Sequence, residues 1–180
     1  NSQPESRLLN DYFLKINPDY CFNLHDQRTI YGSDNDVNPS GLSFLSPCYD
    51  SKGSVNSSRS KSMYIIEHIY SQLSNIIKDR IRLYNDDYNE NCFGDHFQMK
   101  GSSTILFESG FFEKDYNREI TRKYMFFSIV IALELIHNGT WKPRGVNGPE
   151  WFESKPYLDL LEEYGTSWHI RDEDTAGITK

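Results

Sequence analysis

The chain has 180 residues and a formal net charge of −7, and 37% of its residues are hydrophobic and 14% aromatic. This composition supports one packed domain and excludes a largely disordered chain. The acidic balance argues against a generic nucleic-acid-binding or anionic-membrane surface, and no apolar run reaches the length of a membrane span. Three widely spaced cysteines, without a Cys-x-x-Cys pair, indicate neither a disulfide framework nor a zinc ribbon.

The first predicted elements are a helix and a strand. Apolar residues recur at helical spacing over residues 6–16, and Pro18 ends this helix because proline disfavours helix at the residue before it. Residues 20–25 predict a short strand. The polar composition of residues 32–60 predicts a long loop, which only the apolar residues 42–45 interrupt.

Two long helices and a second strand are predicted further along the chain. An apolar stripe predicts a helix over residues 61–83, and a second polar loop covers residues 84–101. Residues 103–108 predict a buried strand that ends in a carboxylate. A helix is predicted over residues 115–137, with burial on most faces because it is apolar on nearly every side. A short helix is predicted around residues 156–164.

The order of these elements predicts an α/β fold, in which ligands bind at the carboxyl ends of the strands. His25 and Glu108 are the last residues of the two predicted strands, which makes both candidates for a functional site. Each also has an ordinary interpretation. His25 could be hydrogen-bonded to its polar neighbours, and Glu108, after four apolar residues, could be a structural buried carboxylate or a general base with a raised pKa.

Three separated segments carry a resemblance to a known family. They read FNLHDQRTIY (22–31), YNDDYNENCFGDHFQ (84–98) and STILFESG (103–110). In this order they resemble the zinc carboxypeptidases related to carboxypeptidase A, most closely a bacterial branch, which the segment DYNREITRKY (115–124) also resembles. The resemblance covers roughly residues 8–137.

The resemblance implies a mixed, mostly parallel sheet flanked by helices, as part of a carboxypeptidase-like phosphorylase/hydrolase architecture. Residues 1–140 would form the C-terminal half of the catalytic domain, and residues 141–180 an extension or tail. The expected partners are a peptide substrate and the N-terminal half of the same domain, with no nucleic acid and no membrane. A homo-oligomer is an alternative that would cover an open sheet edge. The compartment stays open, although scattered cysteines weakly favour the cytoplasm.

The function that the resemblance implies is that of a metallopeptidase, a zinc-dependent hydrolase cleaving a peptide bond near a free C-terminal carboxylate. His25 matches the third zinc ligand of the family. Glu108 matches the general base that takes a proton from zinc-bound water and passes it to the leaving amine. A catalytic zinc site uses three protein ligands and an open position, so one zinc ion is expected in the complete enzyme.

The His-x-x-Glu pair that supplies the family's first two ligands does not occur before Glu108 in this sequence. A similar spacing at His169 and Asp172 follows Glu108 and is interpreted as coincidence. The chain is therefore expected to be a fragment that binds zinc weakly or not at all and is inactive alone. A zinc deacylase or amidase acting on a small acylated amino acid, and a non-catalytic binding module of the same fold, are alternatives.

Three further residues are candidates for substrate binding. The substrate-facing tyrosine of the family precedes the glutamate, and either Tyr84 or Tyr88 could match it, although both could be half-buried aromatic residues. Arg28 could bind a terminal carboxylate by a bidentate contact, or form an ion pair with Asp26 or Asp87.

Overall fold

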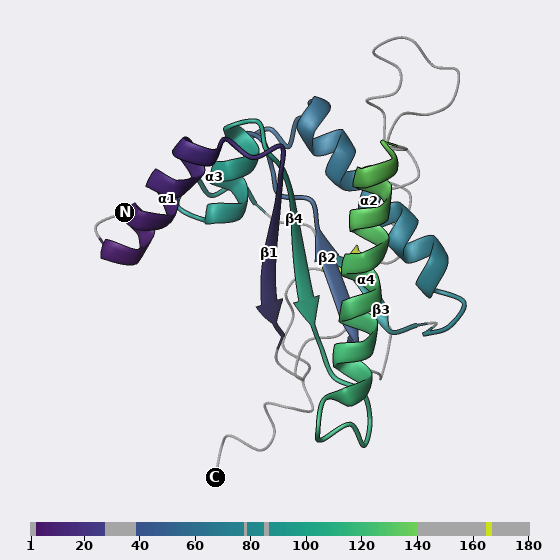
Figure 1. Cartoon of the computed structure of the whole chain (residues 1–180). Coiled ribbons are helices and arrows are strands. Elements are labelled where there is room, and N and C mark those ends of the chain that lie inside the picture. Colours follow the sequence, from purple (N-terminus) through teal and green to yellow (C-terminus); the bar gives the residue numbers. More distant parts are fainter. Residues whose placement is uncertain (1–2, 28–38, 78, 85–86, 140–164, 167–180) are drawn as a thin grey trace, which may run out of the picture.

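A computed structural model of the chain describes residues 3–27, 39–77, 79–84, 87–139 and 165–166. This part of the chain forms an α/β fold in which helices flank a mixed sheet (Figure 1). Arg28 and the short helix predicted around residues 156–164 lie outside the described residues. No described helix has the length and apolar character needed to cross a membrane.

The sheet has the strand order β1-β4-β2-β3-β5. The strands are β1 (Tyr20–Asp26), β2 (Leu42–Leu45), β3 (Ile81–Tyr84), β4 (Ser103–Ser109) and β5 (Gly165–Thr166). The pairs β1/β4, β2/β3 and β3/β5 are parallel, and β2/β4 is antiparallel. The expectation of an α/β fold with a mixed, mostly parallel sheet is thereby confirmed.

Four helices accompany the sheet in the described part of the chain. They are α1 (Pro4–Ile16), α2 (Ser57–Leu73), α3 (Phe93–Met99) and α4 (Glu119–Asn138). Helices α2 and α4 pack against each other and against the middle of the sheet (Figure 1). Helices α1 and α3 lie together near the start of β1 and β4, where the rings of Phe13 and Phe97 stack with their centroids 4.1 Å apart.

The main core lies between α2, α4 and one face of the sheet. Side chains alternate between the two faces of a strand, so Phe44 of β2 and Ile105 and Phe107 of β4 all reach this core. The predicted apolar stripe of α2 packs onto these residues through Ile65, Ile66, Ile69 and Leu73. The remaining strand side chains point to the opposite face of the sheet, and the candidate site lies on that face.

The prediction of one helix over residues 61–83 was wrong at both ends. Helix α2 begins at Ser57, where the Asn56 side chain caps it by accepting from the Arg59 backbone N–H at 2.9 Å. It ends at Leu73, and Ile81–Tyr84 forms β3. The apolar residues of β3 also fit the helical spacing of the stripe, which is why the pattern did not separate the two elements.

Two short elements lie inside segments that were expected to be loops. The apolar residues 42–45, expected only to interrupt a loop, form β2 between β4 and β3. Helix α3 occupies Phe93–Met99 within the second predicted loop. Both elements are short and lie within polar segments, so neither shows enough apolar residues in sequence for a helix or strand periodicity to be recognised.

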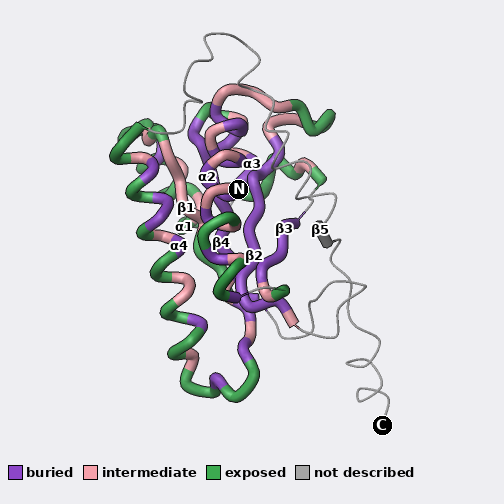
Figure 2. The backbone as a smooth tube through the Cα atoms, turned by 90° about the vertical axis from the view of Figure 1, so that its right-hand side faces the viewer, coloured by how far each residue is buried: buried purple, intermediate pink, exposed green. Residues whose placement is uncertain are grey.

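The prediction that the last long helix is buried on most faces was also wrong. Helix α4 buries Ile131 and Ala132, whereas Phe126 is 62% exposed and Leu133 53% exposed. Figure 2 shows buried and exposed residues alternating along this helix. It begins at Glu119, four residues later than predicted, because the preceding residues form a capping turn described below. Its partners α2 and the sheet lie on one side of it, so hydropathy alone overestimated its burial.

Candidate functional site

His25 and Glu108 lie opposite each other on the neighbouring parallel strands β1 and β4. Paired residues on adjacent strands point to the same face of a sheet, and the Nδ1 atom of His25 is 3.9 Å from the Oε1 atom of Glu108. The His25 side chain is 51% exposed and the Glu108 side chain only 6%. The structure therefore brings together the two residues that the sequence singled out.

The ring of His25 is oriented by Asn23, two residues earlier on the same strand. The Nε2 atom of His25 is 2.8 Å from the Oδ1 atom of Asn23. An amide oxygen can only accept, so Nε2 carries a proton, and in the neutral ring the free lone pair is then on Nδ1. That nitrogen is the one near Glu108. Histidines that bind metals are commonly oriented through their other ring nitrogen in this way.

Burial changes the acidity of Glu108. Removal of its carboxylate from water raises the pKa from 4.5 to about 7, and the negative charge of Asp26 adds to the increase. A carboxyl group with this pKa is present in both protonation states near neutral pH. It can therefore accept a proton and release it again under the same conditions.

Glu108 belongs to a row of polar side chains that crosses the sheet, which we call the polar row. Ser43 of β2 is opposite Glu108, and Arg82 of β3 is opposite Ser43, so His25, Glu108, Ser43 and Arg82 share one face. Ser43 is fully buried and Arg82 is 4% exposed. Sequence reasoning missed both residues, because it assigned Ser43 to a loop and Arg82 to a helix. A polar residue alternating with apolar ones, as in residues 81–84, was the available signal.

A chain of hydrogen bonds reaches the polar row from beyond the end of β1. Ser43 donates to the Oε1 atom of Gln27 at 2.8 Å, and the hydroxyl oxygens of Ser40 and Ser43 are 2.6 Å apart. The backbone N–H of Gln27 donates to the Ser109 carbonyl at 2.7 Å, which continues the β1/β4 pairing by one residue. The side chain of Gln27 thus spans from the end of β1 to Ser43 on β2.

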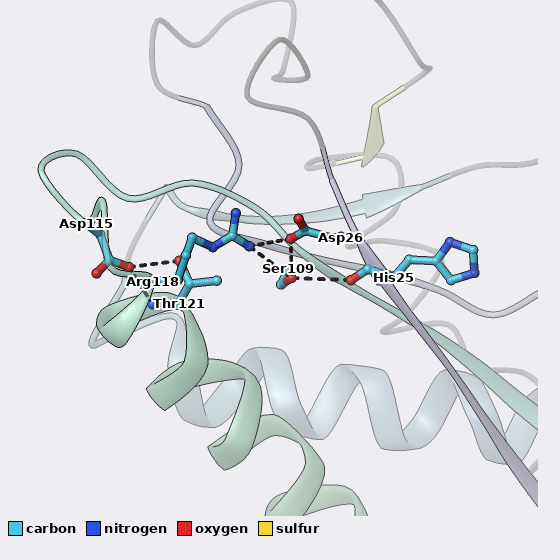
Figure 3. A network of polar contacts seen from close by, with 6 residues as sticks. All are labelled: His25, Asp26, Ser109, Asp115, Arg118 and Thr121. Carbon is cyan, nitrogen blue, oxygen red and sulfur yellow. Dashed lines mark hydrogen bonds and ion pairs between the residues drawn. The ribbon is translucent and has the colours of Figure 1, made fainter.

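A second network, shown in Figure 3, ties the start of α4 to the strand ends. Arg118 forms an ion pair with Asp26 and donates to the Ser109 hydroxyl at 3.2 Å. Ser109 donates to Asp26 at 2.7 Å. Asp26, for which Arg28 was one predicted partner, is therefore paired with Arg118 among the described residues.

Asp115 holds the first turn of α4. Its carboxylate accepts from the backbone N–H groups of Ile120 and Thr121 at 3.1 and 2.8 Å, and from the Thr121 hydroxyl at 2.9 Å. Burial alone would raise the pKa of Asp115, but these hydrogen bonds to the charged form outweigh it and lower the pKa. The capping turn keeps Arg118 next to Asp26, which directly follows His25 on β1.

The two candidate tyrosines have different surroundings. Tyr84 is buried on β3, two residues after Arg82 on the same face, and packs with Leu45 and Leu106. Tyr88 donates its hydroxyl to the sulfur of Met99 at 3.0 Å. Met99 precedes β4, whereas Glu108 lies near the end of that strand, so only Tyr84 lies close to the polar row.

The described residues do not complete a metal site. Within the part of the chain that the structure describes, no group of three or more His, Cys, Asp or Glu side chains could hold a metal ion. His25 offers one imidazole nitrogen beside one carboxylate, whereas a catalytic zinc has three protein ligands. The pair fits one ligand position and an adjacent base, and any remaining ligands lie outside this described part.

In comparisons with known proteins, no family model, no curated protein and no solved structure matches the chain.

Proposed function

We propose that this chain contributes part of the active site of a zinc-dependent peptidase of the carboxypeptidase type, which hydrolyses a peptide bond near a free C-terminal carboxylate. The observation that carries the proposal is the position of His25 beside Glu108 at the ends of two adjacent parallel strands, with 3.9 Å between Nδ1 and Oε1. The resemblance of the segments around both residues to zinc carboxypeptidases supports the same function.

Glu108 is the general base in this proposal. Its pKa of about 7 lets it take a proton from a water molecule at neutral pH and later pass that proton to the leaving amine. Its burial, with 5% of the residue exposed, keeps bulk water away from the carboxyl group. The Asp26 charge that helps to raise the pKa is itself held in place by Arg118.

His25 would hold the zinc ion through its imidazole, and the contact with Asn23 would orient the ring for this role. The other ligands come from outside the described residues, and the N-terminal half of the catalytic domain is the proposed source. His25 and Glu108 by themselves therefore account for one ligand and for proton transfer only.

The test uses the complete gene product. Zinc content is measured by mass spectrometry, and turnover is measured with N-acylated dipeptides that have either a free or an amidated C-terminus. We expect Glu108→Gln to lower kcat by at least about 100-fold while zinc is retained. His25→Ala should lose the zinc. Glu134→Gln makes the same chemical change as the first variant at an exposed position of α4 and should change neither property.

Three results would count against the proposal. Undiminished turnover by Glu108→Gln would remove the general base. Hydrolysis of small acylated amino acids without hydrolysis of dipeptides would favour the deacylase alternative. A complete gene product with neither zinc nor hydrolytic activity would favour a non-catalytic binding module.

A further inference from the structure

The end of β1 that carries His25 is weakly held by packing. In the described sheet β1 pairs only with β4, and the last three residues of β1, which include His25, are exposed. Leu24, the apolar residue among them, is 59% exposed, so little apolar contact fixes this end of the strand. Strand ends with few buried contacts open locally at low cost. Polar contacts are therefore the main means of keeping His25 beside Glu108.

Arg118 supplies such contacts to both strand ends (Figure 3). Asp26 and Ser109 are the last residues of β1 and β4 and are register partners, and the preceding pair is His25 and Glu108. Arg118 forms an ion pair with Asp26 and donates to the Ser109 hydroxyl, which in turn donates to Asp26. We call these three side chains the strand-end clamp. The clamp closes the strand pair one position beyond the candidate site.

The local structure gives no reason for an arginine at this position. Arg118 is the N-cap residue of α4, and its φ of 60° lies in the left-handed region. Helix N-caps favour Ser, Thr, Asp and Asn, and a left-handed φ favours Gly and Asn. The Arg118 side chain makes no capping hydrogen bond. A residue that suits neither its helix position nor its backbone conformation persists where its side chain has another task, and here the side chain reaches the two strand ends.

We propose that Arg118 is a positioning residue, which holds the ends of β1 and β4 in register and thereby keeps His25 beside Glu108. The Arg118 backbone N–H donates to the Asp115 carbonyl at 2.9 Å, so the capping turn fixes the point from which the guanidinium reaches the strands. A slip by one residue would turn the side chains of a strand to the other face and separate the pair. The effect on catalysis rests on the proposed function, whereas the effect on the strand ends does not.

The test replaces Arg118 by a residue that suits its local structure better. Arg118→Asn removes the clamp, whereas asparagine tolerates the left-handed φ and can cap α4. In the complete gene product, with the N-acylated dipeptide that has a free C-terminus, we expect kcat to fall about tenfold and KM to stay unchanged, because positioning acts on the transition state. Tm should equal that of the parent protein or exceed it.

Two further variants serve as controls. Arg118→Lys keeps a cation that can reach Asp26, so it should restore most of the kcat without raising Tm. Arg122→Asn makes the same chemical change about one turn later on α4, where Arg122 is exposed and paired with Glu119 of the same helix, and it should leave kcat unchanged. A kcat equal to that of the parent in Arg118→Asn would overturn the proposal. A fall in Tm that accompanies the loss of kcat would also overturn it, because it would indicate a merely structural role.

Hydrogen exchange followed by NMR measures the clamp without turnover. The backbone N–H of Gln27 donates to the Ser109 carbonyl at 2.7 Å and extends the β1/β4 pairing beyond the clamp. In Arg118→Asn this amide should exchange about tenfold faster, whereas amides in the middle of α4 should exchange at the parent rate or more slowly. In the parent protein, about 1 M NaCl should accelerate exchange of the same amide, because salt screens an exposed ion pair.

The exchange data separate this inference from the proposed function. Unchanged exchange of the Gln27 amide, both in Arg118→Asn and in the parent protein at high salt, would overturn the proposal. An active peptidase with this result would overturn this inference alone. Accelerated exchange in a complete gene product that hydrolyses no peptide would overturn only the proposed function.

Discussion

The carboxyl group of Glu108 lies beside the ring nitrogen of His25 that has the free lone pair, with 3.9 Å between Oε1 and Nδ1. The two residues are 83 positions apart in the sequence and are joined by the pairing of β1 with β4. One is half exposed and the other buried, so a solvent-accessible imidazole lies next to a carboxyl group with a near-neutral pKa.

The raised pKa of Glu108 predicts a specific dependence of stability on pH. The folded protein binds a proton at Glu108 more tightly than the unfolded chain, so this group favours folding at low pH and loses that effect as pH rises from 4.5 to about 7. The loss amounts to at most about 3 kcal/mol. Urea unfolding at pH 5 and pH 8 should show this loss in the parent protein and a smaller one in Glu108→Gln.

Glu134→Gln serves as the control in that experiment, because this exposed carboxylate should give the pH dependence of the parent protein. Identical pH dependence in the parent and in Glu108→Gln would contradict the near-neutral pKa. The other titrating groups, including Glu67, whose pKa burial also raises, are common to all three proteins and cancel in the comparison.

The proposed zinc site predicts that removal of the Asn23 side chain weakens metal binding without unfolding the protein. Asn23→Ala frees the ring of His25 to rotate and change tautomer, so zinc affinity of the complete gene product should fall about 10- to 100-fold. Competition with a zinc-binding dye measures the affinity. Asn23→Asp retains an oxygen acceptor and should restore most of it. Equal affinities for the parent and Asn23→Ala would show that the contact does not orient a ligand.

Asp115 should stabilise the start of α4. Asp115→Ala removes three hydrogen bonds to Ile120 and Thr121 and should lower Tm by about 3–6 °C, whereas Asp115→Asn should lose less because one acceptor remains. The pKa of Asp115 is lowered, so its stabilisation is present above pH 3.8 and is lost as pH falls through its pKa in the folded state. Thermal unfolding followed by circular dichroism measures both effects, and an unchanged Tm in Asp115→Ala would exclude a capping role.

Gly110 should tolerate no side chain. A Cβ atom there would lie 1.9 Å from the carbonyl oxygen of Ser40, so the backbone of one strand end would have to move. Gly110→Ala should therefore lower the free energy of unfolding by at least about 2 kcal/mol. The control is Gly139→Ala at the end of α4, where φ is 60° and a Cβ has no neighbour within 4 Å, and the cost should be about 1 kcal/mol. Equal costs in urea unfolding would contradict the predicted clash.

The sequence predicted the elements that have a long and regular pattern. The first helix and the strands that carry His25 and Glu108 agree with α1, β1 and β4 to within two residues at each end. The α/β class followed from their order. The four-residue strands β2 and β3 were missed, because a few apolar residues fit either a helix or a strand and only pairing with neighbouring strands stabilises the extended form.

The sequence by itself determined that a histidine and a glutamate stand at the ends of two strands, because alternation and strand length can be read locally. Only the tertiary structure decided that β1 and β4 are adjacent, that His25 and Glu108 are in register, and that Ser43 joins them from β2. Register depends on hydrogen bonds and side-chain packing between segments distant in sequence. The burial that moves the pKa of Glu108 toward neutrality depends on the same long-range contacts.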